Sequence, residues 1–200
     1  MKSHYLRWKE SWTKDGPDNS ILEDANGDDL EKLESDLIAN LGTYEALALA
    51  KLGSKNAVPH IERMIASSRG SKKAAYSCAL MRITGNTECI GAIISVLCPP
   101  EWLNLLNHIT CLNWITCWSR IDAAHYLEDC HDPRAFDALE KALSDSSFLV
   151  RANAAIVFSK NSAEITDDST IIDCVGEYNK GKIRLLAKLL RSRIYGENKS

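Results

Sequence analysis

The sequence predicts an all-α fold built from paired helices. First, apolar residues recur at helical spacing, as at Leu30, Leu33, Leu37 and Leu41, which share one face of a helix. Second, similar segments return along the chain at fixed offsets, which is typical of repeat architectures. Third, no convincing run of alternating apolar and polar residues indicates a strand. We expect about ten or eleven short helices joined by short loops.

Length and composition are those of one domain or one short repeat array. The chain has 200 residues, of which 45% are hydrophobic and 26% charged; this is ordinary globular usage and excludes wholesale disorder, a collagen and a membrane protein. No run of about 18 apolar residues predicts a membrane span, and no apolar segment near the N-terminus predicts a secretory signal. The seven cysteines are odd in number and form no CxxC motif, so we expect buried thiols and a cytoplasmic location.

Local signals place the ends of the helices. The first strongly apolar helix can be capped by Asp28 or Asp29 and can end at Gly42, and the next can be capped by Thr43 and end at Gly53. Later helix starts are marked by capping residues and prolines: Asn56 with Pro59, Ser71, Thr87, Pro99–Pro100, Asp132–Pro133, Ser147 and Ser169.

Three segments of twenty residues superpose without gaps. Residues 46–65 match residues 78–97 at a shift of 32, which places Gly53 on Gly85. Residues 124–143 match the first segment at a shift of 78, and a fourth copy begins later and drifts. Each copy reads as a helix pair whose apolar faces are buried only by stacking on the next pair.

One segment, 132–158, carries a recognisable motif. It has an Asp, then a Val-Arg pair five residues later, then two alanines: Asp145, Val150, Arg151, Ala154 and Ala155. The segment resembles the HEAT-repeat (armadillo-type) family, especially the short bacterial HEAT-like repeats also found in phycobilin lyases. The resemblance implies a right-handed α–α superhelix (solenoid) of HEAT-like helix pairs. It also implies a ladder of Asp–Arg hydrogen bonds between neighbouring repeats.

Other junctions depart from this pattern. Arg120 stands at the Arg position of one junction, but Trp114 occupies its Asp position, and another junction offers Ser67 and Lys73. We therefore expect a divergent acidic N-terminal cap at 1–42 and HEAT-like repeats over 43–178, with an insertion at 98–119. A basic capping helix is expected at 179–200. The family serves many functions, so the fold alone does not name one.

Acidic residues are concentrated near the N-terminus. Residues 15–36 hold nine acids against the single base Lys32. An acidic surface of this kind would bind a basic partner faster and more specifically, because the two charges are complementary. The acids that we assign to a partner-binding surface are Asp24, Asp28, Asp29 and Glu31.

Tryptophans add candidate anchors, because Trp is enriched at interface hot spots. His4, Trp8 and Trp12 are spaced by four and would share one helical face, either as a docked cap or as an aromatic arm for a partner. The insertion holds three more, Trp102, Trp114 and Trp118. These either fill a longer core helix pair or line a binding groove.

Sites for chemistry are not evident in the sequence. The five histidines and seven cysteines show no zinc-ligand spacing, and no GxSxG, Walker or dinucleotide motif is present. We therefore predict no catalytic residue, no metal and no cofactor. The net charge of −3 argues against nucleic acid as a partner.

These features together predict a non-enzymatic protein-binding module. A narrower form is an immunity or antitoxin-like protein whose acidic N-terminal third masks a basic toxin domain. The alternative is a HEAT-like DNA-binding protein or DNA glycosylase-type enzyme, for which Trp114, Trp118 and Asp122 are suggestive. A lyase-like role is a further alternative, although no lyase-specific motif accompanies the repeat.

Overall fold

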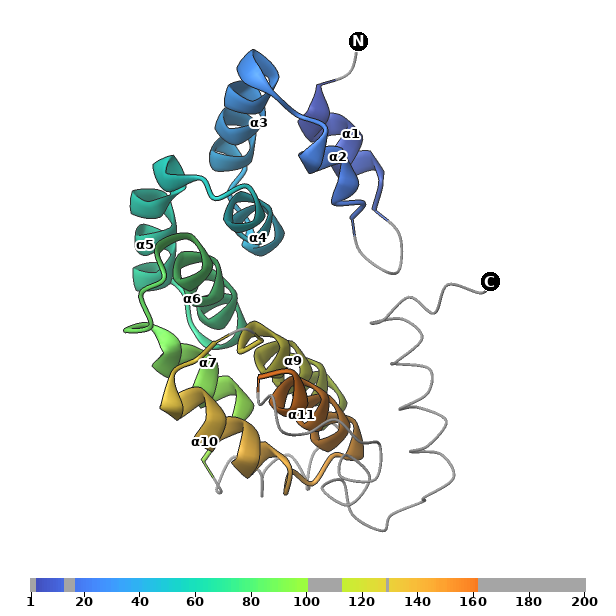
Figure 1. Ribbon diagram of the computed structural model, residues 1–200, viewed down its shortest axis with the longest axis vertical. Coiled ribbons are helices and arrows are strands. Elements are labelled where there is room, and N and C mark those ends of the chain that lie inside the picture. Colours follow the sequence, from blue (N-terminus) through green and yellow to red (C-terminus); the bar gives the residue numbers. More distant parts are fainter. Residues whose placement is uncertain (1–2, 13–16, 101–112, 129, 162–200) are drawn as a thin grey trace. The chain divides into compact units, whose positions relative to one another are not determined.

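The computed structural model describes residues 3–12, 17–100, 113–128 and 130–161. Within these ranges every regular element is a helix (Figure 1), which confirms the predicted all-α class. The chain forms two compact units, Met1–Ile93 and Ile94–Ser200, and each is described by itself below.

The first unit opens with three helices, α1 (His4–Glu10), α2 (Ser20–Glu23) and α3 (Gly27–Ala39). Helix α1 packs against both α2 and α3. The α3 side chains that enter the core are Leu33 and Leu37, two residues of the predicted apolar face. Burial of this face, and not intrinsic propensity, supplies most of the stability of so short a helix.

The ends of α3 differ from the prediction. The helix starts one residue before the predicted cap Asp28, with Asn26 as its capping residue. Asp28 and Asp29 lie instead in the first turn, where the positive end of the helix dipole favours carboxylates. The helix also ends before Gly42, which serves as the N-cap of the next helix.

The rest of the first unit is a compact helical group made of α4 (Thr43–Lys51), a 3₁₀ turn η1 (Lys55–Ala57), α5 (Val58–Ser67) and α6 (Gly70–Thr84). Helix α6 packs against α4 and α5 (Figure 1). Small buried residues let these helices approach closely: Ala46, Ala50, Ala57, Ala75 and Ala79. Pro59 lies in the first turn of α5, as predicted, where the missing N–H costs no helical hydrogen bond.

Two glycines end helices in the left-handed conformation. Gly53 follows α4 with φ of 66°, and Gly85 follows α6 with φ of 71°. The Gly85 amide donates to the Met81 carbonyl at 2.8 Å, which satisfies one of the free carbonyls at the helix end. A residue with a Cβ would be strained at both positions.

Helix α7 (Ile90–Leu97) spans the boundary, and the second unit continues with α9 (Asn113–Tyr126), α10 (Pro133–Ala142) and α11 (Phe148–Asn161). Helix α11 packs against α9 and α10. The Asp132 side chain accepts the Arg134 amide at 2.9 Å, so the predicted cap at Asp132–Pro133 is confirmed. The core of these three helices is aliphatic: Ile121, Ala124, Leu127, Leu139, Val150 and Ala154.

Several predicted features fall outside the described residues. They are Trp102, most of the insertion at 98–119, the cap at Ser169 and the basic helix at 179–200. The five cysteines that the structure describes form no disulfide with one another, and Cys78, Cys117 and Cys130 are buried.

Candidate protein-binding surface

A ladder of four aromatic rings runs from the core of the first unit to its surface. Tyr5 and Trp8 on α1 are buried, whereas Trp12 is 40% exposed and Tyr44 on α4 is 52% exposed. Successive ring centroids lie 6.3 Å apart from Tyr5 to Trp8, 6.1 Å from Trp8 to Trp12 and 4.5 Å from Trp12 to Tyr44. The last two contacts are edge-to-face, a preferred aromatic geometry.

Trp8 is the most deeply buried ring of the aromatic ladder. Its side chain is 1% exposed, and its indole N–H donates to the Asn19 carbonyl oxygen Oδ1 at 3.1 Å. A buried ring that is already hydrogen-bonded offers no surface to a partner. Trp8 therefore belongs to the core and not to the candidate surface for which the sequence suggested it.

Trp12 reaches the surface by a different route from the predicted one. Helix α1 ends at Glu10, and Ser11 is its C-cap, so Trp12 lies beyond the helix and does not share a helical face with His4 and Trp8. Its ring instead meets Tyr44 at the start of α4. This contact joins segments 32 residues apart, and neither helical spacing nor a motif indicates it.

Ser11 fixes the backbone on either side of the Trp12 position. Its hydroxyl donates to the Trp8 carbonyl at 2.6 Å and accepts the Asp18 amide at 2.9 Å. The Asp18 carboxylate in turn accepts from the Ser20 hydroxyl and amide, and these hydrogen bonds lower the pKa of Asp18 below its usual value. The segment that leads back into α2 is thus tied to the end of α1.

Four exposed carboxylates lie on the same unit, and they are the predicted acids. Asp24 follows α2, while Asp28, Asp29 and Glu31 lie in the first two turns of α3, and all four are exposed. They have no ion-pair partner among the residues that the structure describes. Glu23, by contrast, pairs with Lys51 at 2.7 Å, so it is partly neutralised.

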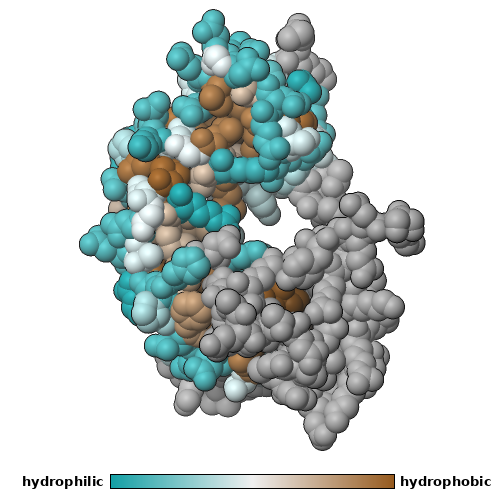
Figure 2. Space-filling model, in the orientation of Figure 1, coloured by the Kyte–Doolittle hydropathy of each residue, from teal (hydrophilic) through white to brown (hydrophobic). Residues whose placement is uncertain are grey.

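Figure 2 shows apolar residues of the first unit surrounded by hydrophilic ones. Partly buried apolar side chains border the core here, including Ile21, Ala25, Ile38 and Leu41. Together with Trp12 and Tyr44, these side chains add apolar surface to the unit that carries the four exposed acids. Residues of this mixture, aromatic anchors with a polar surround, are typical of protein interfaces.

The other predicted tryptophans belong to the second unit. Trp118 on α9 is 50% exposed, only the backbone of Trp114 is described, and Trp102 is outside the described residues. Sequence reasoning missed Tyr44, Ser11 and Asn19, because their roles depend on contacts between segments and not on local spacing.

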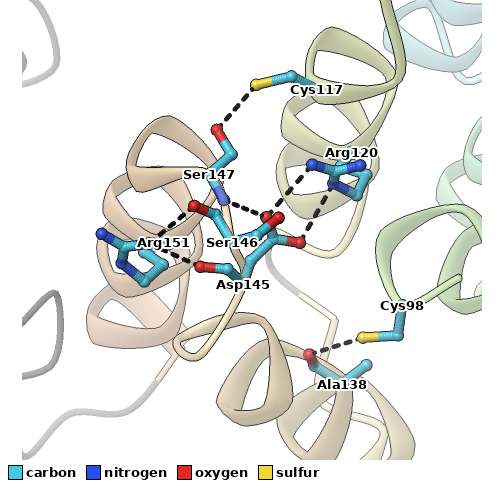
Figure 3. Close-up of polar contacts among 8 residues, drawn as sticks. All are labelled: Cys98, Cys117, Arg120, Ala138, Asp145, Ser146, Ser147 and Arg151. Carbon is cyan, nitrogen blue, oxygen red and sulfur yellow. Dashed lines mark hydrogen bonds and ion pairs between the residues drawn. The ribbon is translucent and has the colours of Figure 1, made fainter. Parts of the chain in front are cut away.

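The second unit contains a buried ion pair (Figure 3). Arg120 on α9 is 2% exposed, and its Nε and Nη2 atoms lie 3.1 and 3.2 Å from the Asp145 carboxylate oxygens. That carboxylate also accepts the Ser147 amide at 2.7 Å. Arg151 donates to the backbone carbonyls of Asp145 and Ser146 at 2.6 and 3.3 Å. The network ties α9 to the start of α11.

A second polar group lies further along α9. Asp122 is exposed to solvent on one side. The protein on its other side raises the pKa of the carboxyl by desolvation, and the charge of His125 partly opposes this shift. His125 Nε2 lies 2.9 Å from Asn153 Oδ1. Across the described parts of both units, no group of three His, Cys, Asp or Glu side chains could hold a metal ion.

No helix in the described ranges is both long enough and apolar enough to cross a membrane. A scan against protein-family models, a search of curated proteins and a search of solved structures each found no match.

Proposed function

We propose that this chain is a non-enzymatic protein-binding module that recognises a basic protein surface, without a metal or a cofactor. The observation that carries the proposal is the coexistence, on one small unit, of an exposed aromatic pair and four exposed carboxylates without ion-pair partners. Contiguous exposed apolar surface marks interaction sites, and Trp and Tyr are enriched among the residues that contribute most binding energy.

The two kinds of residue would act at different stages of binding. Carboxylates at the surface attract a basic partner over about 8 Å at physiological ionic strength and so raise the association rate. Aromatic side chains that become buried in the complex slow dissociation, since they supply most of the contact energy in protein interfaces.

The proposed fold is a right-handed α–α superhelix of HEAT-like helix pairs. Three helix pairs coincide with the three matching segments of the sequence: α4 with α5, α6 with α7, and α9 with α10. The matched glycines Gly53 and Gly85 both have left-handed φ values. The Arg120–Asp145 pair agrees with the Asp–Arg ladder that the HEAT resemblance implies.

The narrower proposal is an immunity or antitoxin-like protein that acts in the cytoplasm and masks a basic toxin domain. Its support is the position of the acids. Asp28 and Asp29 at the N-terminus of α3 are stabilised by the helix dipole, so the fold tolerates a concentrated negative surface there. Binding of a toxin by this surface would neutralise that charge.

Affinity capture from the source cells, followed by mass spectrometry, tests the proposal. The informative variant reverses the four acids, with Asp24→Lys, Asp28→Lys, Asp29→Lys and Glu31→Lys combined. Its matched control makes the same charge change at exposed acids elsewhere, with Glu62→Lys, Glu88→Lys, Asp137→Lys and Glu140→Lys. Circular dichroism verifies that both variants fold.

We expect one basic protein to be retained by the wild type and the control but lost by the four-acid variant. Purified partner should then associate more slowly with the variant, and the difference should shrink as salt is added. Equal retention by all three proteins would contradict the acidic surface, and recovery of nucleic acid would contradict a protein partner.

A DNA glycosylase-type enzyme is the second candidate. One observation favours it: Trp118 and Asp122 are four residues apart on α9, hence on one face, and the carboxyl of Asp122 has a raised pKa. Base release from damaged duplex DNA, abolished by Asp122→Asn, would establish this activity. Binding to duplex DNA with a steep salt dependence would accompany it.

A further inference from the structure

We propose that the Trp12–Tyr44 pair receives an arginine side chain of the basic partner, an inference that rests on the proposed function. The rings come from two elements, since Trp12 follows α1 and Tyr44 lies in the first turn of α4. They meet edge-to-face with an interplanar angle of 83°. Much of both side chains remains exposed, so ring surface is open to a ligand.

Aromatic rings attract cations through the negative potential of their faces, and Trp does so most strongly. The ladder already binds one cation at its inner end. Lys9 Nζ lies 5.4 Å from the centroid of the Tyr5 ring and 3.1 Å from the Tyr5 hydroxyl oxygen. Within the described residues, the outer rings of Trp12 and Tyr44 have no comparable contact with a cation.

Two acidic residues lie close to the pair along the chain or through a hydrogen bond. The Asp18 amide donates at 2.9 Å to Ser11, the residue before Trp12, and hydrogen bonds from Ser20 lower the pKa of the Asp18 carboxyl below its usual value. Glu45 follows Tyr44 directly in α4. The pKa of Lys9 is raised mainly by its hydrogen bond to Tyr5, and Glu45 adds a smaller contribution of the same sign. Acidic residues are therefore neighbours of Trp12 and Tyr44 in the chain.

This combination favours a guanidinium over an ammonium group. The planar guanidinium of arginine stacks on a ring face while its edge donates hydrogen bonds to carboxylates. The lysine ammonium is more strongly hydrated and cannot stack. We therefore expect the Trp12–Tyr44 pair to add preference for arginine, whereas the acids Asp24, Asp28, Asp29 and Glu31 attract any positive charge.

The position of Trp12 is established before binding. Its ring contacts the buried ring of Trp8, and the adjacent Ser11 is hydrogen-bonded on both sides. A side chain that is already ordered loses little entropy when a ligand binds. The receptor thus needs no rearrangement of the aromatic ladder.

Calorimetric titration with hexa-arginine and hexa-lysine peptides tests the proposal at low ionic strength. The full-length protein should bind hexa-arginine about two- to fivefold more tightly, the range expected for a cation–π contact at an exposed site. Trp12→Leu and Tyr44→Leu should each bring the ratio toward one, because loss of a ring should weaken hexa-arginine binding more than hexa-lysine binding. Phe148→Leu removes an exposed aromatic side chain from the other unit and should preserve the ratio.

An unchanged arginine-to-lysine ratio in both Trp12→Leu and Tyr44→Leu would overturn the proposal. Two variants are used so that a folding defect in one does not decide the outcome. The four-acid variant separates this inference from the proposed function. It should weaken both peptides equally and keep the ratio, whereas unchanged affinity for both would contradict the acidic surface alone.

Discussion

Removal of the buried Arg120–Asp145 pair should have a large and specific effect on stability. Arg120 is 2% exposed and contacts both oxygens of the Asp145 carboxylate at 3.1 and 3.2 Å. Arg120→Met retains most of the aliphatic volume but leaves the carboxylate buried, with the Ser147 amide as its remaining donor among the described residues. Loss of one partner of a buried pair costs about 3–5 kcal/mol, against a total stability of about 5–15 kcal/mol for a domain.

The double variant distinguishes the pair from simple packing. Asp145→Asn keeps an oxygen that can accept the Ser147 amide, but it leaves the Arg120 charge without its counter-ion, so it should also lose about 3 kcal/mol. Arg120→Met combined with Asp145→Asn removes both charges. Because no unpaired charge remains, we expect the double variant to be no less stable than the less stable of the two single variants, which corresponds to a coupling energy of about 3 kcal/mol or more.

Urea denaturation followed by circular dichroism measures these changes, and amide hydrogen exchange in α9 and α11 locates them. The matched control is Arg134→Met, because Arg134 pairs with Asp132 at 2.7 Å but is 54% exposed. An exposed pair of this kind contributes about 0–1 kcal/mol. The reasoning is refuted if Arg120→Met costs no more than Arg134→Met, or if the two single losses simply add in the double variant.

Three further predictions concern other parts of the chain. Trp8→Ala removes the buried anchor of the aromatic ladder and should lower the free energy of unfolding by about 3–5 kcal/mol in urea denaturation; a loss below about 1 kcal/mol would place Trp8 outside the core. Gly85→Ala should lower the free energy of unfolding by about 1–2 kcal/mol. The loss would come from backbone strain, because φ is 71° and an added Cβ would meet nothing within 4 Å. The control is Gly91→Ala, because this glycine of α7 is likewise open to a Cβ but has no positive φ. Asp122→Asn should stabilise the protein near neutral pH, because desolvation raises the folded-state pKa of this carboxyl and ionisation above that pKa disfavours the fold. The gain should vanish below about pH 3.5, where Asp122 is protonated in both the folded and unfolded states, and stability curves at several pH values show whether it does.

Local signals predicted much of the helical structure. Leu33 and Leu37 lie on the buried face of α3, as their spacing indicates. Asp132 caps α10 because its side-chain oxygen accepts the amide of Arg134, two residues later, which is a contact that local sequence alone can predict. The start of α3 was predicted wrongly at Asp28. Gly27, the first residue of the helix, has φ of 52°, a turn conformation that glycine adopts readily and that helical spacing does not indicate.

The candidate surface was predicted in its acids and in Trp12, but not in the way that Trp12 is positioned. Asp28, Asp29 and Glu31 are exposed because they occupy the polar side of an amphipathic helix, which periodicity indicates. Trp12 was assigned to a continuous helix with Trp8, yet the chain leaves the helix at Ser11. Tyr44 carried no signal, because its role arises from the tertiary contact with Trp12. Helical spacing does not predict contacts of this kind, because they join segments that are distant in the sequence.

The aromatic ladder connects the stability of the first unit to its proposed binding surface. Trp12 keeps its position because its ring contacts Trp8, and Trp8 keeps its own through burial and the bond to Asn19. A change deep in α1 would therefore reach the surface through these two rings. It follows that Trp8→Phe, which retains an aromatic ring but not the indole N–H, should weaken arginine preference without altering any exposed residue. A change confined to the exposed acids would leave that preference intact, so the same unit offers two separable contributions to recognition.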